Sequence, residues 1–225
     1  MLEEQSRLLP QFGQGVSTIF KLHGPLRPPP KSWTRGMVWS ALELSNLSGE
    51  AIVLSAPNPK NMRPSPFVVR CLEARLPEPH EVAADVACGY GRHLRPLKRL
   101  GYSVVGVDLN EVALRFIKRR QPRTMLVRAD IRAGLPIKAR SLGLAVVVQY
   151  PLLDVIPLLA AALIPGGYAI LESIGGQGRN WQVLSKKGAL RRRLKRTFEI
   201  LELHEHSVGP LDSGAVVARA FVRRK

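Results

Sequence analysis

The chain has 225 residues, 45% of them hydrophobic, and its 34 Lys and Arg outnumber 17 Asp and Glu to give a formal net charge of +17. This length accommodates one complete α/β core with an extension, whereas two cores would not fit comfortably. No apolar run approaches the length that crosses a bilayer, so we expect no membrane insertion. Cys71 and Cys88 are too few for a disulfide framework and wrongly spaced for zinc, so we expect no structural metal.

The positive charge has two interpretations. A net charge of this size attracts polyanions, so nucleic acid is a possible partner, but a generally solubilising surface explains the same charge. The N-terminal sequence MLEEQSRLLPQFGQG lacks the basic, apolar and small-residue regions of a secretory signal. We therefore expect a cytoplasmic protein.

Residues 1–66 are rich in breakers, with PLRPPP at 25–30 and APNPKNMRPSP at 56–66. The ordered pieces expected here are a strand at 51–54 and a helix over 67–76 that begins after Pro66. We divide the chain into an N-terminal extension at 1–66, either a lid or the relic of a fused domain, and a second domain at 67–225.

From residue 81 short apolar runs alternate with amphipathic segments, which is typical of βαβ units on a parallel sheet. The runs are VAADVAC, YSVVGVD, RTMLVRAD, LGLAVVVQY and GYAILES. Two further runs, FEILELHEHSV and SGAVVARAFVRR, are joined by GPLD and predict an antiparallel hairpin. The pattern predicts an α/β, Rossmann-like, doubly wound and mostly parallel seven-stranded sheet that ends in this hairpin.

The segment DVACGYGRHL predicts a ligand-binding turn after the first strand of the sheet. Gly89 and Gly91 lack a Cβ, which lets backbone N–H groups approach a ligand closely. Asp108 ends the next strand, where a carboxylate can accept hydrogen bonds from both hydroxyls of a ribose. The dinucleotide fingerprint requires a third glycine where this chain has Leu94, which argues against NAD. Pro96 is expected to remove a backbone bond from the following helix and to kink it.

These residues resemble the class I S-adenosylmethionine (SAM)-dependent methyltransferases, whose first motif is an acidic residue, small or apolar residues and Gly-x-Gly. The resemblance continues through Asp108, ADI at 129–131, LIPGG at 163–167 and the hairpin, and it covers 67–225. It implies that SAM is the cofactor, with Asp108 on the ribose and with Asp130 and the Ile131 N–H on the adenine. The cofactor-binding residues that it implies are Asp85, Ala87, Gly89, Gly91, Asp108, Leu109, Asp130, Ile131 and Gln149.

The acidic residues also have structural interpretations. Asp85 would only cap local amides, Asp108 would be a solvated strand end, and Asp130 would be the N-cap of a short helix before Gly134. The spacing of all three, together with the two glycines of the turn, favours the cofactor.

Within the class, RPSPF at 63–67, GRH at 91–93, ILES at 170–173 and KKGALRRRLKRTFEIL resemble bacterial small-molecule methyltransferases of the tellurite-resistance type, which are sometimes fused to a rhodanese domain. That resemblance implies a small-molecule acceptor.

Methyl transfer from a sulfonium is an in-line displacement with a positively charged leaving group, so alignment matters more than a dedicated base. Ligands of open α/β sheets lie outside the carboxyl strand ends, here near Gln149 and Tyr150. The candidates for the acceptor pocket are Gln149, Tyr150, Asp154 and Glu172, and no catalytic residue is assigned. Tyr150 packing on the sheet edge and Asp154 capping the next helix are the structural alternatives.

Nucleic-acid methylation has fewer matching residues. Neither cysteine lies at the end of the fourth strand, where methylation of a pyrimidine carbon needs one, and the sequence there lacks the Pro-Pro-aromatic pattern of adenine methylation. The basic stretch at 186–196 has Leu190, Leu194 and Phe198 at intervals of four, which predicts an amphipathic helix with its basic side in water. We rank a small-molecule methyltransferase first, an enzyme for RNA or a ribosomal component second, and a SAM-binding protein without catalysis third.

Overall fold

The computed structural model describes residues 41–45, 51–55, 63–73, 82–174 and 180–225. The chain divides into two units, one at Ser17–Arg63 and one that contains Pro64–Lys225. In the first unit β1 (Ala41–Ser45) pairs antiparallel with β2 (Ala51–Ser55). The strand predicted at 51–54 is confirmed, and its partner was not predicted.

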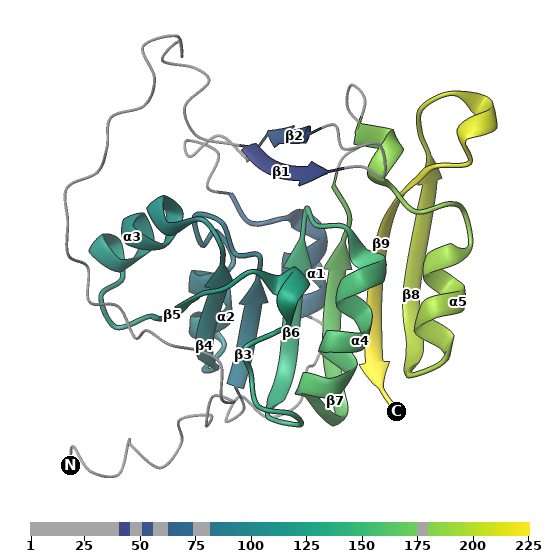
Figure 1. The fold of residues 1–225 in the computed structure, drawn as a ribbon. Helices are drawn as coiled ribbons and strands as arrows, with labels where there is room; N and C mark the ends of the chain where they lie inside the picture. Colours follow the sequence, from purple (N-terminus) through teal and green to yellow (C-terminus); the bar gives the residue numbers. More distant parts are fainter. Residues whose placement is uncertain (1–40, 46–50, 56–62, 74–81, 175–179) are drawn as a thin grey trace, which may run out of the picture. The chain divides into compact units, whose positions relative to one another are not determined.

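A seven-stranded sheet organises the second unit (Figure 1). Its spatial order is β5-β4-β3-β6-β7-β9-β8, in which the first five strands run parallel and β9 is antiparallel to both of its neighbours. The strands are β3 (Val82–Val86), β4 (Ser103–Asp108), β5 (Met125–Arg128), β6 (Leu142–Val148), β7 (Leu163–Glu172), β8 (Phe198–Ser207) and β9 (Val216–Arg224). The predicted Rossmann-like sheet with its closing hairpin is confirmed.

Five α-helices accompany the described strands. They are α1 (Pro66–Glu73), α2 (Leu94–Arg99), α3 (Glu111–Arg120), α4 (Leu152–Ala162) and α5 (Ala189–Lys195). Pro66 starts α1 where a missing N–H costs nothing, and Asn110 caps α3 by accepting hydrogen bonds from two backbone N–H groups of its first turn. The predicted helix over 67–76 is described as far as Glu73, and residues 74–76 lie outside the described residues.

Several local expectations need correction. Pro96 is the third residue of α2, where a backbone N–H has no intrahelical partner, so it removes no helical hydrogen bond. Asp154 lies in the first turn of α4, whose N-cap position is Pro151, so the predicted Asp154 cap is wrong. Phe198 begins β8 and does not continue α5. The predicted Pro-Gly-Gly turn lies inside β7, where pairing with β6 passes directly from Leu163 to Tyr168.

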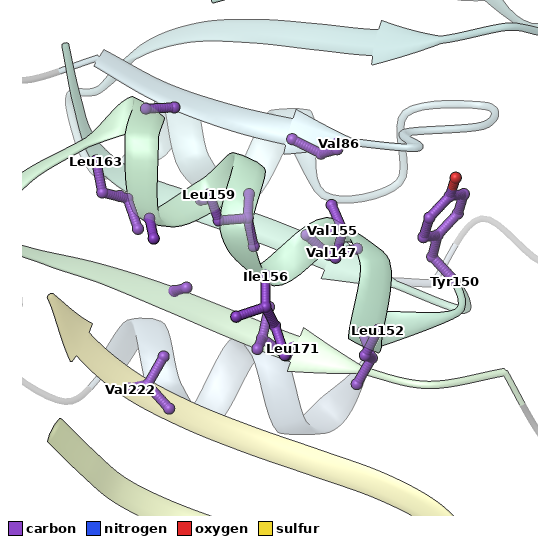
Figure 2. Close-up of a cluster of buried hydrophobic side chains, with 14 of the residues drawn as sticks. Val86, Val147, Tyr150, Leu152, Val155, Ile156, Leu159, Leu163, Leu171 and Val222 are labelled. Carbon is purple, nitrogen blue, oxygen red and sulfur yellow. The ribbon is translucent and has the colours of Figure 1, made fainter. Parts of the chain in front are cut away.

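The main core lies between α4 and the strands that it crosses. All seven residues of β6 are buried, as expected for a central parallel strand with helices on both faces. Figure 2 shows Val155, Ile156 and Leu159 of α4 against this layer, while Tyr150 lies at the edge of the cluster with its hydroxyl directed away from it. The core therefore fixes the positions at which β6 and β7 end.

No helix in the described part of the chain is long and apolar enough to cross a membrane.

Candidate cofactor and acceptor site

The predicted site residues follow strands that are neighbours in the sheet. β3 pairs with β4 on one side and with β6 on the other, and the chain crosses over in opposite directions from this point. Such a switch point leaves a crevice at the carboxyl strand ends in doubly wound sheets. The turn after β3, Asp108 at the end of β4 and Gln149 after β6 therefore belong to one edge of the sheet.

The turn after β3 needs its two glycines for different reasons. Both have positive φ, +51° at Gly89 and +75° at Gly91. A Cβ on Gly91 would lie 2.6 Å from Leu94 Cδ1 and 3.0 Å from the Ile117 side chain, whereas a Cβ on Gly89 would meet no atom within 4 Å. Gly91 is thus required by packing against the buried Leu94, and Gly89 faces open space in which a ligand can approach the backbone.

Asp108 closes this turn onto the end of β4. Its Oδ2 accepts a hydrogen bond from the Gly89 N–H at 2.6 Å, and its Oδ1 accepts one from the Asn110 N–H at 2.8 Å. The side chain is buried, so the alternative of a solvated strand end is wrong. Burial raises the pKa of Asp108, and the two backbone N–H groups oppose that rise. Each oxygen keeps acceptor capacity for a further donor, as a ribose requires.

Asp85 is the least satisfied polar residue in this region. It is 1% exposed within β3, and its Oδ2 has no hydrogen-bond partner among the described residues. Its Oδ1 lies 3.8 Å from Nδ1 of His93. An unpaired buried carboxylate oxygen costs about 1–3 kcal/mol or more, so this position favours a ligand that brings a donor. Oδ2 therefore caps no amide of the described chain, unlike in the structural alternative for Asp85.

Asp130 caps a short helical turn, as its structural alternative expected. It is the N-cap of a short 3₁₀ turn at Ile131–Ala133 and accepts a hydrogen bond from the Arg132 N–H at 3.0 Å. The Arg132 guanidinium also donates to both carboxylate oxygens, which lowers the pKa of Asp130. A contact from Asp130 to adenine would therefore share these oxygens with Arg132 and remains a prediction.

The acceptor candidates differ in their surroundings. Gln149 is exposed, has a φ of +60°, and donates its N–H to the Glu172 carbonyl at 2.8 Å. Tyr150 is buried at the edge of the core, as its structural alternative expected, and burial raises its pKa. Asp154 is exposed on α4. Glu172 ends β7 with its side chain largely buried.

Sequence reasoning missed three residues that the fold brings to this edge, which are Ser65, His93 and Arg219. Ser65 donates its N–H to Nε2 of His93 at 3.1 Å and its hydroxyl to Oε2 of Glu172 at 2.5 Å. Arg219 lies 3.4 Å from the other oxygen of Glu172. Ser65 and His93 belong to the RPSPF and GRH segments that carried a family resemblance, but nothing in the sequence paired them.

Arg92 adds a cation beside these carboxylates. Its side chain is half-buried, and this burial lowers its pKa, while the charges of Asp85 and Glu172 act in the opposite direction. The described residues contain no cluster of three His, Cys, Asp or Glu able to hold a metal ion.

Comparison with known proteins finds one matching family model, within the large sheet. Residues 83–167 match the profile of a methyltransferase domain family. No curated protein matches the chain significantly.

Solved structures with a similar fold include a SAM-dependent methyltransferase from Mesorhizobium loti, with 21% identity and a TM-score of 0.53 over 71% of this chain and 99% of that one. A geranyl diphosphate methyltransferase in complex with SAM shares 15% identity, with a TM-score of 0.55 over 70% and 84% of the two chains. The cyclase SpnF shares 17% identity, with a TM-score of 0.55 over 70% and 79%. At these identities the likeness shows the fold.

Proposed function

We propose that the chain is a class I SAM-dependent methyltransferase that uses SAM as its cofactor and transfers the methyl group to a small-molecule acceptor. The observation that carries this proposal is the buried Asp85 carboxylate, whose Oδ2 has no hydrogen-bond partner among the described residues and which lies in the strand that leads into the turn at Gly89. SAM has a cationic ammonium on its methionine part, and such a group would supply the missing donor.

We place SAM at the turn and the strand ends by pairing each part of the molecule with side chains of suitable polarity and hydrogen-bonding capacity. Asp108 would accept from the ribose hydroxyls, and Asp130 with the Ile131 N–H would contact the adenine. Leu109 is 39% exposed directly after Asp108 and offers an apolar surface for the ring. Ala87, Gly89 and Gly91 shape the turn, whereas Asp85 and Gln149 would hold the methionine part.

The chemistry requires little from the protein beyond alignment. A lone pair of the acceptor forms a bond to the methyl carbon while the methyl–sulfur bond breaks, and its electron pair returns to sulfur to give S-adenosylhomocysteine. A neutral acceptor then loses a proton to solvent or to a base. The raised pKa of Tyr150 leaves its hydroxyl protonated at neutral pH, and Glu172 is engaged by Ser65 and Arg219. We therefore assign no catalytic base.

The position of the basic helix supports a small acceptor over RNA. Leu190 and Leu194 of α5 are fully buried, and the arginines between them are exposed. α5 packs against β8, the edge strand that is separated from β3 by β6, β7 and β9. Its basic face therefore belongs to a different part of the sheet from the methyl donor. The tellurite-resistance-type resemblance of the flanking segments points the same way.

A SAM-binding protein without methyl transfer is the second candidate. Two observations favour it: Tyr150 is buried at the edge of the core, and one protein of the same fold is named a cyclase. This candidate shares the cofactor site and differs only in what happens at the acceptor.

Two measurements test these proposals. In calorimetry we expect SAM and S-adenosylhomocysteine to bind and NAD to bind more weakly. Asp108→Ala should weaken SAM binding by about 100-fold or more, since hydrogen bonds to a charged group contribute roughly 1.5–3 kcal/mol each. The matched control is Asp212→Ala, which removes an exposed carboxylate from a distant turn. Wild-type affinity in Asp108→Ala would refute the ribose assignment.

Transfer itself is tested with methyl-labelled SAM and fractionated cell pools. Label in the metabolite fraction supports the proposal, and label confined to RNA overturns it. Tight SAM binding with no label in any fraction, including protein, supports the second candidate.

A further inference from the structure

We propose that His93 is a positioning residue for the Asp85 carboxylate at the proposed cofactor site. Together with Ser65, His93 links Asp85 to Glu172. This inference rests on the proposed function, in which Asp85 meets the ammonium of the methionine part. The four residues come from β3, the start of α2, the start of α1 and the end of β7. Consecutive members are joined by approaches of 3.8, 3.1 and 2.5 Å.

The hydrogen bond from Ser65 decides which nitrogen of His93 carries the proton. The Ser65 N–H donates to Nε2 at 3.1 Å, so Nε2 must be an unprotonated acceptor. A neutral imidazole then has its proton on Nδ1, the nitrogen that faces Oδ1 of Asp85. His93 is 2% exposed, and its ring is held between these two groups without access to bulk water.

The separation of 3.8 Å between Nδ1 and Oδ1 is longer than a normal hydrogen bond. Nδ1 of His93 therefore faces Oδ1 of Asp85 without a hydrogen bond, while Oδ2 has no partner in the described chain and keeps its acceptor capacity. Arg92 contributes a nearby positive charge to both Asp85 and Glu172. In this proposal a ligand ammonium would bind Oδ2, and the Nδ1–H dipole that faces Oδ1 would favour the orientation of the carboxylate that presents Oδ2 to the ligand.

Ser65 connects His93 to Glu172 on the acceptor side, and each of its polar groups makes a hydrogen bond. Its N–H binds His93, its carbonyl accepts the Val69 N–H at the start of α1, and its hydroxyl binds Glu172. The Glu172 carbonyl in turn accepts the N–H of Gln149 at 2.8 Å. We call this series of four residues, Asp85, His93, Ser65 and Glu172, the relay. It extends from the proposed methionine site to the backbone of the proposed acceptor site.

Two substitutions separate the two functions of the imidazole. His93→Gln places an amide oxygen near the position of Nε2, which keeps an acceptor for Ser65 but removes the donor toward Asp85. His93→Asn places an amide nitrogen near the position of Nδ1, which keeps the donor but removes the acceptor for Ser65. The exposed His206 of β8 offers the matched controls His206→Gln and His206→Asn.

The test is calorimetry on the full chain with S-adenosylhomocysteine and with 5′-methylthioadenosine, which lacks the ammonium and carboxylate of the methionine part. We expect His93→Gln to lower the affinity for S-adenosylhomocysteine by about tenfold, since the Asp85 carboxylate then loses the Nδ1–H dipole that faces its Oδ1. Its affinity for methylthioadenosine should stay within about twofold of wild type, since that ligand makes no contact with Asp85. His93→Asn should keep the discrimination between the ligands but unfold at a lower temperature, and the controls should change neither property.

Asp85→Asn in the same assay separates the two proposals. If Asp85→Asn keeps the wild-type preference for S-adenosylhomocysteine, the proposed methionine site is wrong. If Asp85→Asn loses that preference and His93→Gln keeps it, the site stands and the relay is wrong. Imidazole ¹⁵N shifts of the wild-type protein give a result that does not depend on any variant folding. A neutral Nδ1–H form of His93 supports the relay, and an Nε2–H form or an imidazolium overturns it.

Discussion

Gly89 and Gly91 occupy the same turn with positive φ but face different surroundings. We expect Gly91→Ala to lower the free energy of unfolding by about 2 kcal/mol or more, from backbone strain together with overpacking against Leu94 and Ile117. Gly89→Ala carries the strain alone, roughly 1 kcal/mol, but should lower SAM affinity by about tenfold or more because its methyl group enters the ligand space.

Denaturant unfolding without ligand and SAM calorimetry, run on both glycine variants, check this pair. Each variant serves as the control for the other, since both change one hydrogen to a methyl group. Equal losses of stability would contradict the packing argument. Unchanged SAM affinity in Gly89→Ala would show that the ligand does not approach this part of the backbone.

The pKa of Asp108 predicts a stability difference that depends on pH. Because burial raises this pKa in the folded state, the folded protein binds more protons than the unfolded chain just above the ordinary aspartate pKa. The contribution of Asp108 to stability therefore falls as pH rises through that range. The unfolding free energy of wild type minus that of Asp108→Asn should decrease from acid toward neutral pH in denaturant titrations without ligand. A difference that increases with pH would mean that the hydrogen bonds from Gly89 and Asn110 outweigh burial.

At the scale of elements, α5 has a buried apolar stripe and an exposed basic face. Leu194 is fully buried within the main core, whereas its neighbour Arg193 is exposed. We expect Leu194→Ala to cost about 2–5 kcal/mol of unfolding free energy, as for other buried leucines, and Arg193→Ala to cost less than about 0.5 kcal/mol. Thermal and denaturant unfolding of the two variants measure this. A comparable loss in Arg193→Ala would mean that the basic face makes structural contacts.

The elements themselves were predictable to within a few residues because their signals are local. Short apolar runs between amphipathic segments identified each strand of the large sheet. The four-residue spacing of Leu190 and Leu194 identified α5. Where prediction failed, a contact from elsewhere decided the outcome. Phe198 continues the helical spacing but begins β8, because it pairs with Arg224 of β9. Asp154 follows a residue pattern typical of a cap, yet α4 starts two residues earlier.

At the scale of the whole molecule, the predicted domain boundary after residue 66 can be tested by truncation. All strands of the large sheet lie within 64–225, so we expect a chain that begins at Pro64 to fold. A chain that begins at Phe67 also lacks Ser65 and leaves Nε2 of the buried His93 without its donor. It should be less stable by about 1–3 kcal/mol, the cost of an unsatisfied buried polar group. Equal stability of the two truncated chains in denaturant titrations would place the boundary where it was predicted.

The amino-acid sequence alone determined the order of the elements in the large sheet, the parallel strands with their closing hairpin, and the glycine turn after the first strand of that sheet. These features depend on the spacing of apolar residues and on the residues that favour turns, and both are local signals within a few positions of the chain.

Only the tertiary structure decided which polar groups are buried and what they meet. The hydrogen bonds of Ser65 reach residues 28 and 107 positions away, and they form because the strand order brings the ends of β3 and β7 to one edge of the sheet. The same order buries Asp108, packs Tyr150 into the core and leaves Asp85 with an unpaired oxygen. Such contacts carry no local signal, because they depend on burial and on neighbours that the fold alone supplies.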